Sequence, residues 1–97
     1  MAGKQVMVVG LGQLGMAVIR SLADADVEVL AIDRRPEVVQ LASSYVTEAL
    51  CFDATDEESL ARTSPAQRDV CICTIGDESR EAAIVVTALL RKLGAPR

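Results

Sequence analysis

A glycine loop near the start of the chain, formed by Gly10, Gly12 and Gly15, leaves few folds open. An apolar segment at residues 6–9 precedes the loop, and an amphipathic helical pattern comes after it. A second apolar segment then ends in Asp33. A G-x-G-x-x-G run alone is weak evidence, because glycine triplets occur by chance in many loops. Strand, glycine turn, helix and a second strand ending in a carboxylate, in that order, predict a Rossmann-like α/β fold that binds an adenine nucleotide.

Each glycine has its own expected role. Gly10 lets the backbone leave the strand in a tight turn, Gly12 leaves room for a pyrophosphate, and Gly15 lets the next helix lie close to the sheet. The helix begins near Gln13 and Leu14, so its free N–H groups and the positive end of its dipole point at the phosphates. The alternative is a plain strand-to-helix turn without a ligand.

Asp33 is the expected ribose contact. It lies 18 residues beyond Gly15, where a carboxylate can accept hydrogen bonds from both ribose hydroxyls. A 2′-phosphate would meet this charge, which favours NAD, ATP or ADP over NADP. Arg34 and Arg35 oppose that interpretation, because arginines at this position form some NADP sites. A solvated carboxylate and a solvated arginine pair are the alternatives.

Strand and helix patterns alternate along the chain. Strands are expected at residues 5–9, 27–32, 48–52 and 70–75. Helices are expected at residues 13–25, from Pro36 to residue 43 or 44, briefly between Thr55 and Ser64, and at residues 79–93. Such βα units in series imply right-handed crossovers and a three-layer parallel sheet in the order 3-2-1-4. The ligand crevice would lie above strands one and four, lined by residues 10–15, 33–35, 53–55 and 76–77.

Local patterns refine these elements. The first helix should bury Leu14, Val18 and Leu22, which recur on one of its faces. Thr55 and Glu58 have the spacing of a capping box, which would begin the third helix. The apolar run at residues 70–75, in which Thr74 is the one polar residue, favours a central position in the sheet.

The last helix is apolar on two sides. Ile84 and Ala88 lie among charged residues, and Gly94 with Pro96 ends the helix. The opposite, broader apolar face comprises Ala82, Ala83, Val85, Val86, Leu89, Leu90 and Leu93. A helix of this kind needs two packing partners. One is the sheet, and the other is a further segment of the domain or a partner subunit, unless the two residues are simply exposed.

Composition excludes several classes of protein. With 97 residues, a net charge of −4 and no basic run longer than two residues, we expect the chain to form at most one domain and to have no nucleic-acid partner. Cys51, Cys71 and Cys73 fall in strand patterns and histidine is absent, so we expect small core residues instead of disulfides or a zinc site. No apolar stretch approaches about 20 residues, and no signal-peptide core precedes the first strand, which predicts a cytoplasmic location.

Four motifs come in sequence along the chain: Val-Gly-Leu-Gly-Gln-Leu-Gly at 9–15, Val-Leu-Ala-Ile-Asp at 29–33, Asp-Ala-Thr-Asp at 53–56 and Thr-Ile-Gly-Asp at 74–77. Together they resemble the N-terminal lobe of an RCK domain, also called KTN or TrkA-N, over nearly the whole chain. Such domains are cytosolic regulatory parts of bacterial Trk- and Ktr-type potassium uptake systems and of related channels. The Asp-Ala-Thr is more specific than the glycine loop, which many dehydrogenases share.

The resemblance implies a role for each site residue. Phosphates would be held by Gly10, Gly12 and Gly15 and the ribose by Asp33, and the adenine would be bordered by Asp53, Ala54 and Thr55, with Gly76 near the ribose and phosphates. The predicted cofactor-binding set also includes Gln13, Leu14, Arg34 and Arg35. ATP, ADP or NAD(H) would bind as a signal without turnover and change the shape of a ring of these domains. The full-length protein would be a homo-oligomer, cytoplasmic and peripheral to the inner membrane through a potassium channel or transporter subunit.

Two positions depart from the family pattern. Several members carry an Arg, which can reach a terminal phosphate, where this chain has Gln13, so discrimination between ATP and ADP is open. Phe52 stands where a Gly is common and would reshape the adenine edge. The family lobe also continues into a fifth and a sixth strand, so we expect this single domain, residues 1–97, to be a truncated lobe.

Other functions use the same first 35 residues. A dehydrogenase needs a catalytic set, but the chain has no His, and its only Tyr, Tyr45, is not followed by a Lys four residues later. An enzyme is therefore not expected. The chain could still be the cofactor-binding half of a longer NAD(P)-dependent dehydrogenase, or an assembly module with a vestigial nucleotide site.

Overall fold

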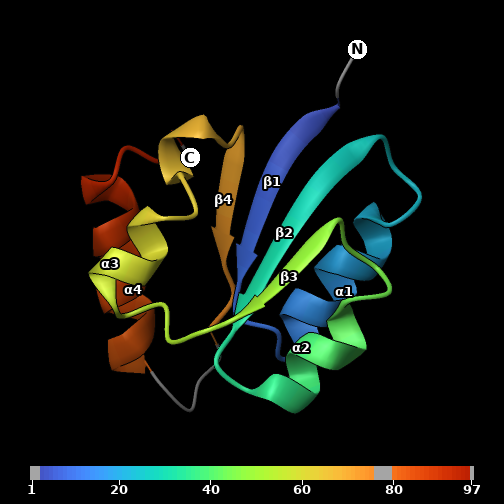
Figure 1. Cartoon of the computed structure of the whole chain (residues 1–97), viewed down its shortest axis with the longest axis horizontal. Coiled ribbons are helices and arrows are strands. Elements are labelled where there is room, and N and C mark those ends of the chain that lie inside the picture. The colour runs from blue at the N-terminus through green and yellow to red at the C-terminus, as the bar shows by residue number, and fades with distance from the viewer. Residues whose placement is uncertain (1–2, 76–79, 97) are drawn as a thin grey trace.

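A parallel sheet forms the centre of the molecule (Figure 1). The computed structural model describes residues 3–75 and 80–96, and in this part of the chain the strand order is β3-β2-β1-β4. The strands are β1 (Lys4–Val9), β2 (Val27–Asp33), β3 (Glu48–Cys51) and β4 (Val70–Cys73). Every pairing is parallel, with Val8 of β1 opposite Ala31 of β2 and Ile72 of β4. The predicted α/β class and strand order are confirmed.

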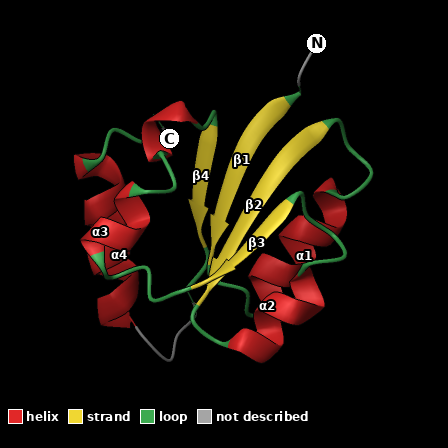
Figure 2. Ribbon diagram, viewed as in Figure 1, coloured by secondary structure: helices red, strands yellow, loops and turns green. Residues whose placement is uncertain are grey.

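Helices cover both faces of the sheet, which gives three layers (Figure 2). One face carries α1 (Gln13–Leu22) and α2 (Pro36–Ala42), and the other carries α3 (Glu57–Ala61) and α4 (Arg80–Lys92). A short 3-10 turn, Pro65–Gln67, precedes β4. Each helix comes after its strand along the chain, as expected for right-handed βα units.

Alternation along the central strands divides the core in two. Met7 and Val9 of β1 belong to the cluster that includes Leu60 of α3 and Val86 and Leu90 of α4. Val6 and Val8 belong to the second cluster, with Ile19 of α1 and Ala42 of α2. Successive strand residues point to opposite faces, so a strand covered on both sides must be apolar throughout. Burying one such aliphatic side chain contributes about 1.5–3 kcal/mol.

The predicted buried face of α1 is wrong at its first residue. Leu14 is 65% exposed, and the fully buried positions of the helix are Gly15 and Ile19. Gly15 must lie against the preceding loop, and this contact sets the rotation of the helix about its axis. The inward stripe then runs through residues 15, 19 and 22, which leaves Leu14 beside it.

The predicted capping box of α3 is also wrong. The hydroxyl of Thr55 donates to Oδ1 of Asp53 at 2.7 Å instead of capping the helix, and Asp56 occupies the N-cap position. Glu58 accepts a hydrogen bond from Arg62 at 2.9 Å. A carboxylate two residues before Thr55 offers its hydroxyl a closer partner than the helix end does.

The expectation of a central fourth strand is wrong for the part of the chain described. β4 is an edge strand, and its residues Val70–Cys73 are half-buried. A strand is apolar throughout when helices cover both of its faces. The apolar run therefore does not indicate whether another strand pairs with β4 on each side. Cys71 and Cys73 are correspondingly half-buried rather than fully buried, and Cys51 is exposed.

The last helix buries a narrower face than predicted. Val86 and Leu90 are buried, whereas Val85 of the predicted broad face is 42% exposed. Ile84, predicted to lie on the opposite side of the helix, is 64% exposed. At the C-terminal end Gly94 has φ of 92°, and the N–H of Ala95 donates to the carbonyl of Leu90 at 2.9 Å. This is the expected glycine-ended helix terminus.

Candidate nucleotide-binding site

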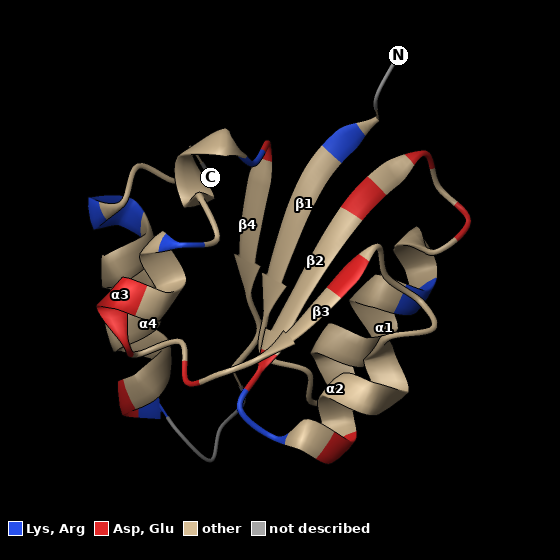
Figure 3. Ribbon diagram, viewed as in Figure 1, with Lys and Arg blue, Asp and Glu red and all other residues tan. Residues whose placement is uncertain are grey.

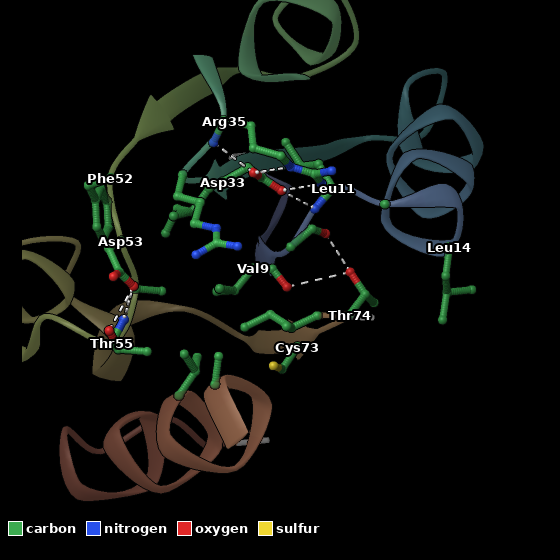
Figure 4. A pocket seen from close by; sticks show the side chains of 18 of the residues that line it. Val9, Leu11, Leu14, Asp33, Arg35, Phe52, Asp53, Thr55, Cys73 and Thr74 are labelled. Carbon is green, nitrogen blue, oxygen red and sulfur yellow. Dashed lines mark hydrogen bonds and ion pairs between the residues drawn. The ribbon is translucent and has the colours of Figure 1, made fainter. Parts of the chain in front are cut away.

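A cleft of about 540 Å³ lies where the carboxyl ends of the strands meet, a size typical of small-ligand sites (Figure 4). Backbone hydrogen bonds join the loops around it: the N–H of Gly10 donates to the Ile32 carbonyl at 2.8 Å, and the N–H of Phe52 donates to the Asp33 carbonyl at 3.1 Å. The cleft is lined by ten of the predicted site residues: Gly10, Gly12, Gln13, Leu14, Asp33, Arg34, Arg35, Asp53, Ala54 and Thr55. Gly15 lies behind the loop, and Gly76 and Asp77 fall outside the described residues.

The three glycines of the loop differ in what a side chain would meet. Gly10 has φ of 98°, and a Cβ there would lie 2.8 Å from the backbone nitrogen of Ile75. A Cβ on Gly15 would collide with the carbonyl of Gly10 and lie 2.7 Å from Oγ1 of Thr74. Apart from its neighbours along the chain, a Cβ on Gly12 would have no described atom within 4 Å. Backbone geometry and packing therefore account for Gly10 and Gly15, whereas the described packing does not require a glycine at position 12.

The first turn of α1 faces the same cleft. The N–H of Met16 donates to the Gly12 carbonyl at 2.9 Å, so the N–H groups before it belong to the first turn, which has no intrahelical acceptors for them. The turn carries no acidic residue that would repel an anion. Together with the open space at Gly12, this arrangement suits a phosphate group.

Asp33 is held in place at the end of β2. It is only 8% exposed, and its Oδ2 accepts a hydrogen bond from the Leu11 N–H at 2.8 Å. Its Oδ1 accepts one from the Arg35 N–H at 2.9 Å, and the guanidinium of Arg35 contacts both oxygens, from Nε at 3.0 Å and from Nη2 at 3.1 Å. Burial raises the pKa of Asp33, but the hydrogen bonds from Arg35 and Leu11 outweigh it and hold the pKa below its ordinary value.

The loop after β3 forms a tight polar turn. Oδ1 of Asp53 accepts hydrogen bonds from the N–H of Thr55 at 3.0 Å and from its hydroxyl at 2.7 Å. These two bonds, with a smaller contribution from the charge of Arg34, lower the pKa of Asp53. Ala54 is buried under the turn, and half-buried Phe52 lies beside it. The turn therefore has a fixed shape at the edge where the adenine is expected.

Thr74 lines the cleft, although the sequence analysis named it only as part of a motif and not as a candidate site residue. Its hydroxyl donates to the Gly10 carbonyl at 2.5 Å, and its N–H donates to the Val9 carbonyl at 2.8 Å. Thr74 is the first polar residue after the apolar run of β4, and this was the available signal. The hydrogen bond from the Leu11 N–H to Asp33 could not be predicted from the sequence, because any residue other than proline at position 11 would supply the same backbone N–H. The apolar wall of the cleft comes from Cys73, Ile75, Ala82 and Val86.

Neither a metal centre nor a membrane span emerges from the described residues. Within residues 3–75 and 80–96, no three His, Cys, Asp or Glu side chains gather in a way that could hold a metal ion. Over the same ranges, no helix has the length and apolar character needed to cross a membrane.

The parallel sheet, the glycine loop after β1 and the carboxylate at the end of β2 define a Rossmann-like nucleotide-binding domain. More specifically, the chain belongs to the TrkA-N domain family, which matches residues 6–97. The family predicted from the four motifs is thus confirmed.

Curated relatives carry the same domain. Over 91 residues the chain is 33% identical to Ktr system potassium uptake protein A of Vibrio alginolyticus and to Ktr system potassium uptake protein C of Bacillus subtilis (strain 168). It is 34% identical over 93 residues to Ktr system potassium uptake protein A of Bacillus subtilis (strain 168). These matches cover 94% or 96% of the chain but 41% of each relative, so the chain spans about two-fifths of their length.

Solved structures with the same fold include enzymes. Apo saccharopine dehydrogenase (L-Glu forming) from Saccharomyces cerevisiae superposes with a TM-score of 0.73 and 26% identity, over 94% of this chain and 20% of that one. The crystal structure of AibC superposes with a TM-score of 0.72 and 22% identity, over 98% of this chain and 26% of that one. The second likeness concerns the fold alone.

Proposed function

We propose that this chain is a regulatory domain that binds ATP, ADP or NAD(H) as a signal, without turnover, in a Ktr-type potassium uptake system. The family and the relatives support the regulatory assignment. The observation that carries the nucleotide assignment is that two features line the same cleft. One is Gly12, where packing does not require a glycine, and the other is the buried carboxylate of Asp33.

The cleft offers a separate place for each part of the ligand. The phosphates would lie over Gly12 and the first turn of α1, and the ribose would lie at Asp33. The adenine would lie against the turn of Asp53, Ala54 and Thr55, beside Phe52. Gly76, predicted to approach the ribose and phosphates, comes directly after the segment that lines the cleft at Thr74 and Ile75.

The partners are proposed from the relatives, which are named as potassium uptake proteins. The chain would act on a membrane transporter subunit from the cytoplasmic side, as part of a homo-oligomer. Exposed Ile84 and Val85 on α4 offer apolar surface for such assembly. Nucleic acid is not a proposed partner, because Lys and Arg are spread over separate elements with acidic residues between them (Figure 3).

A dehydrogenase half is the second candidate, and the likeness to saccharopine dehydrogenase favours it. The dehydrogenase half and the regulatory domain would make the same phosphate and ribose contacts, but they differ in what happens to the bound nucleotide. A sensor domain releases its nucleotide unchanged, whereas a dehydrogenase half binds a nicotinamide cofactor in preference to ATP and, joined to the rest of its enzyme, oxidises or reduces it.

Parallel calorimetric titrations of the chain with ATP, ADP, NADH and NADPH test the proposal. We expect ATP, ADP or NADH to bind more tightly than NADPH, and Asp33→Ala to weaken binding by about 1.5–3 kcal/mol. Circular dichroism of the variant checks that it is folded. Preference for NADPH would favour the dehydrogenase, and absence of binding by all four would favour an assembly module with a vestigial site.

A further inference from the structure

Every acceptor position of the Asp33 carboxylate is already used. An ionised carboxylate has two oxygens with about four lone-pair positions. Oδ2 accepts from the Leu11 N–H at 2.8 Å and from Nη2 of Arg35 at 3.1 Å. Oδ1 accepts from the Arg35 N–H at 2.9 Å and from Nε of Arg35 at 3.0 Å. A ribose diol donates two hydrogen bonds, so it cannot join this carboxylate unless two of these donors leave.

The four donors divide into two fixed and two removable ones. The N–H groups of Leu11 and Arg35 belong to the backbone at the ends of β1 and β2, and they hold the carboxylate in position. The guanidinium is carried by a side chain that is 40% exposed. The guanidinium donates one hydrogen bond to each oxygen of Asp33 (Figure 4). Two neighbouring ribose hydroxyls would need the same two acceptor positions, one on each oxygen.

The chain keeps the guanidinium close by local means. Arg35 has φ of −96° and ψ of 112°, the extended conformation favoured for a residue that precedes a proline, here Pro36. This conformation, together with the Arg35 N–H bond to Asp33, places the start of the side chain beside the carboxylate. Two parallel hydrogen bonds from one guanidinium to one carboxylate make this a strong type of side-chain ion pair.

We propose that Arg35 is a built-in competitor of the nucleotide: its guanidinium occupies the two positions of Asp33 that the ribose diol takes, and the side chain must swing out when the ligand binds. The inference rests on the proposed function, because it concerns the same cleft. It makes Arg35 a residue that sets affinity and ligand choice. A nucleotide with both hydroxyls gains their bonds only by displacing the guanidinium, whereas one without them binds with the ion pair intact.

The test measures the affinity of the whole chain for ATP and for 2′,3′-dideoxy-ATP. Arg35→Met keeps an apolar stem of similar length and removes the guanidinium, and Arg62→Met is the control. Arg62 also carries one positive charge, pairs with Glu58 on the exposed end of α3, and is not among the residues that line the cleft. Arg35→Lys retains the charge but loses the two-pronged geometry.

We expect Arg35→Met to bind ATP about fivefold more tightly than the unmodified chain, the factor expected from releasing one half-exposed ion pair. Loss of a positive charge alone would weaken the binding of a polyphosphate. Tighter binding of ATP to Arg35→Met would therefore be the opposite of the result expected from the change in charge. Dideoxy-ATP should bind no more tightly to Arg35→Met, because it does not use the released positions. Arg35→Lys should show a smaller gain for ATP, and Arg62→Met should change neither affinity by more than about twofold.

The outcomes separate the inference from the proposed function. Equal losses for ATP and dideoxy-ATP in Arg35→Met would show that the guanidinium contacts phosphate, and would overturn the competitor role while leaving nucleotide binding intact. Unchanged ATP affinity in a folded Arg35→Met would overturn it as well. If neither the unmodified chain nor any variant binds ATP, the proposed function fails and the inference fails with it.

Discussion

At the scale of single residues, Gly12 and Gly15 have opposite reasons for being glycine. A side chain on Gly15 would collide with the Gly10 carbonyl and Thr74, whereas a side chain on Gly12, which lines the cleft, would meet open space. Gly15→Ala should lower the free energy of unfolding by about 1–3 kcal/mol through overpacking. Gly12→Ala should lower it by no more than about 1 kcal/mol but weaken ATP binding about tenfold, because the methyl group separates the phosphates from the main chain.

Urea denaturation and titration of the two variants check this pair. A Gly12→Ala variant that binds ATP as tightly as the unmodified chain would contradict the phosphate position proposed for Gly12. A Gly15→Ala variant of unchanged stability would contradict the close contact between α1 and the loop.

The carboxylate of Asp33 should make stability depend on pH in the acid range. Its pKa is lowered from the ordinary value of 3.8, so the unfolded chain takes up the proton first as the pH falls. The stabilisation is therefore complete above pH 3.8 and is lost as the pH falls through the lower pKa of the folded state. Urea denaturation between about pH 5 and about pH 2 measures this loss. Asp33→Asn should flatten part of the dependence, leaving the contribution of Asp53, whose pKa is also lowered.

A pH dependence of stability as steep in Asp33→Asn as in the unmodified chain would show that other carboxylates cause it.

The features of single residues could be predicted from the sequence to different degrees. The sequence indicated Asp33 through its place after an apolar strand, but the pairing with Arg35 depends on side-chain geometry that no pattern encodes.

At the scale of elements, Thr74 joins the end of β4 to the loop after β1. Its buried hydroxyl donates to the Gly10 carbonyl at 2.5 Å. Thr74→Val keeps the shape and removes that bond, and should lower the free energy of unfolding by about 1–2 kcal/mol and weaken nucleotide binding. Thr87→Val is the matched control, because the Thr87 hydroxyl donates to the Ala83 carbonyl at 2.8 Å within an exposed helix. The control should change stability by no more than about 0.5 kcal/mol.

Equal effects of the two substitutions in thermal or urea denaturation would show that the Thr74 bond does not tie the loop to β4. Both substitutions remove the same hydroxyl, which is buried after β4 at Thr74 and exposed on α4 at Thr87.

The types and order of the elements were predictable, whereas their faces and edges were not. Alternating apolar strands and amphipathic helices indicate βα units wherever they pack. Leu14 is exposed because Gly15 fixes the rotation of α1, and β4 lies at an edge although its run is apolar. Thr55 bonds to Asp53 instead of capping α3. Each of these outcomes depends on a neighbour that the local pattern does not contain.

At the scale of the whole molecule, parallel strands bring four loops to one end of the sheet. That arrangement gathers residues from separate parts of the chain around a single cleft, with helices on both faces (Figure 1). The sequence predicted that residues 10–15, 33–35 and 53–55 meet, since the carboxyl ends of parallel strands share one edge. The fourth predicted segment, 76–77, falls outside the described residues. The sequence could not predict the apolar wall of Ala82 and Val86, which depends on how α4 packs back over the sheet.

The most direct test of the nucleotide site is the map of amide chemical-shift changes when ATP is added to the isotopically labelled chain. We predict that the largest changes fall at Gly10–Gly15, at Asp33–Arg35 and at Asp53–Thr55, while the far ends of the strands around Lys4 and Val27 remain unchanged. Changes centred on another surface, or none at saturating ATP, would contradict the assignment of this cleft as the nucleotide site.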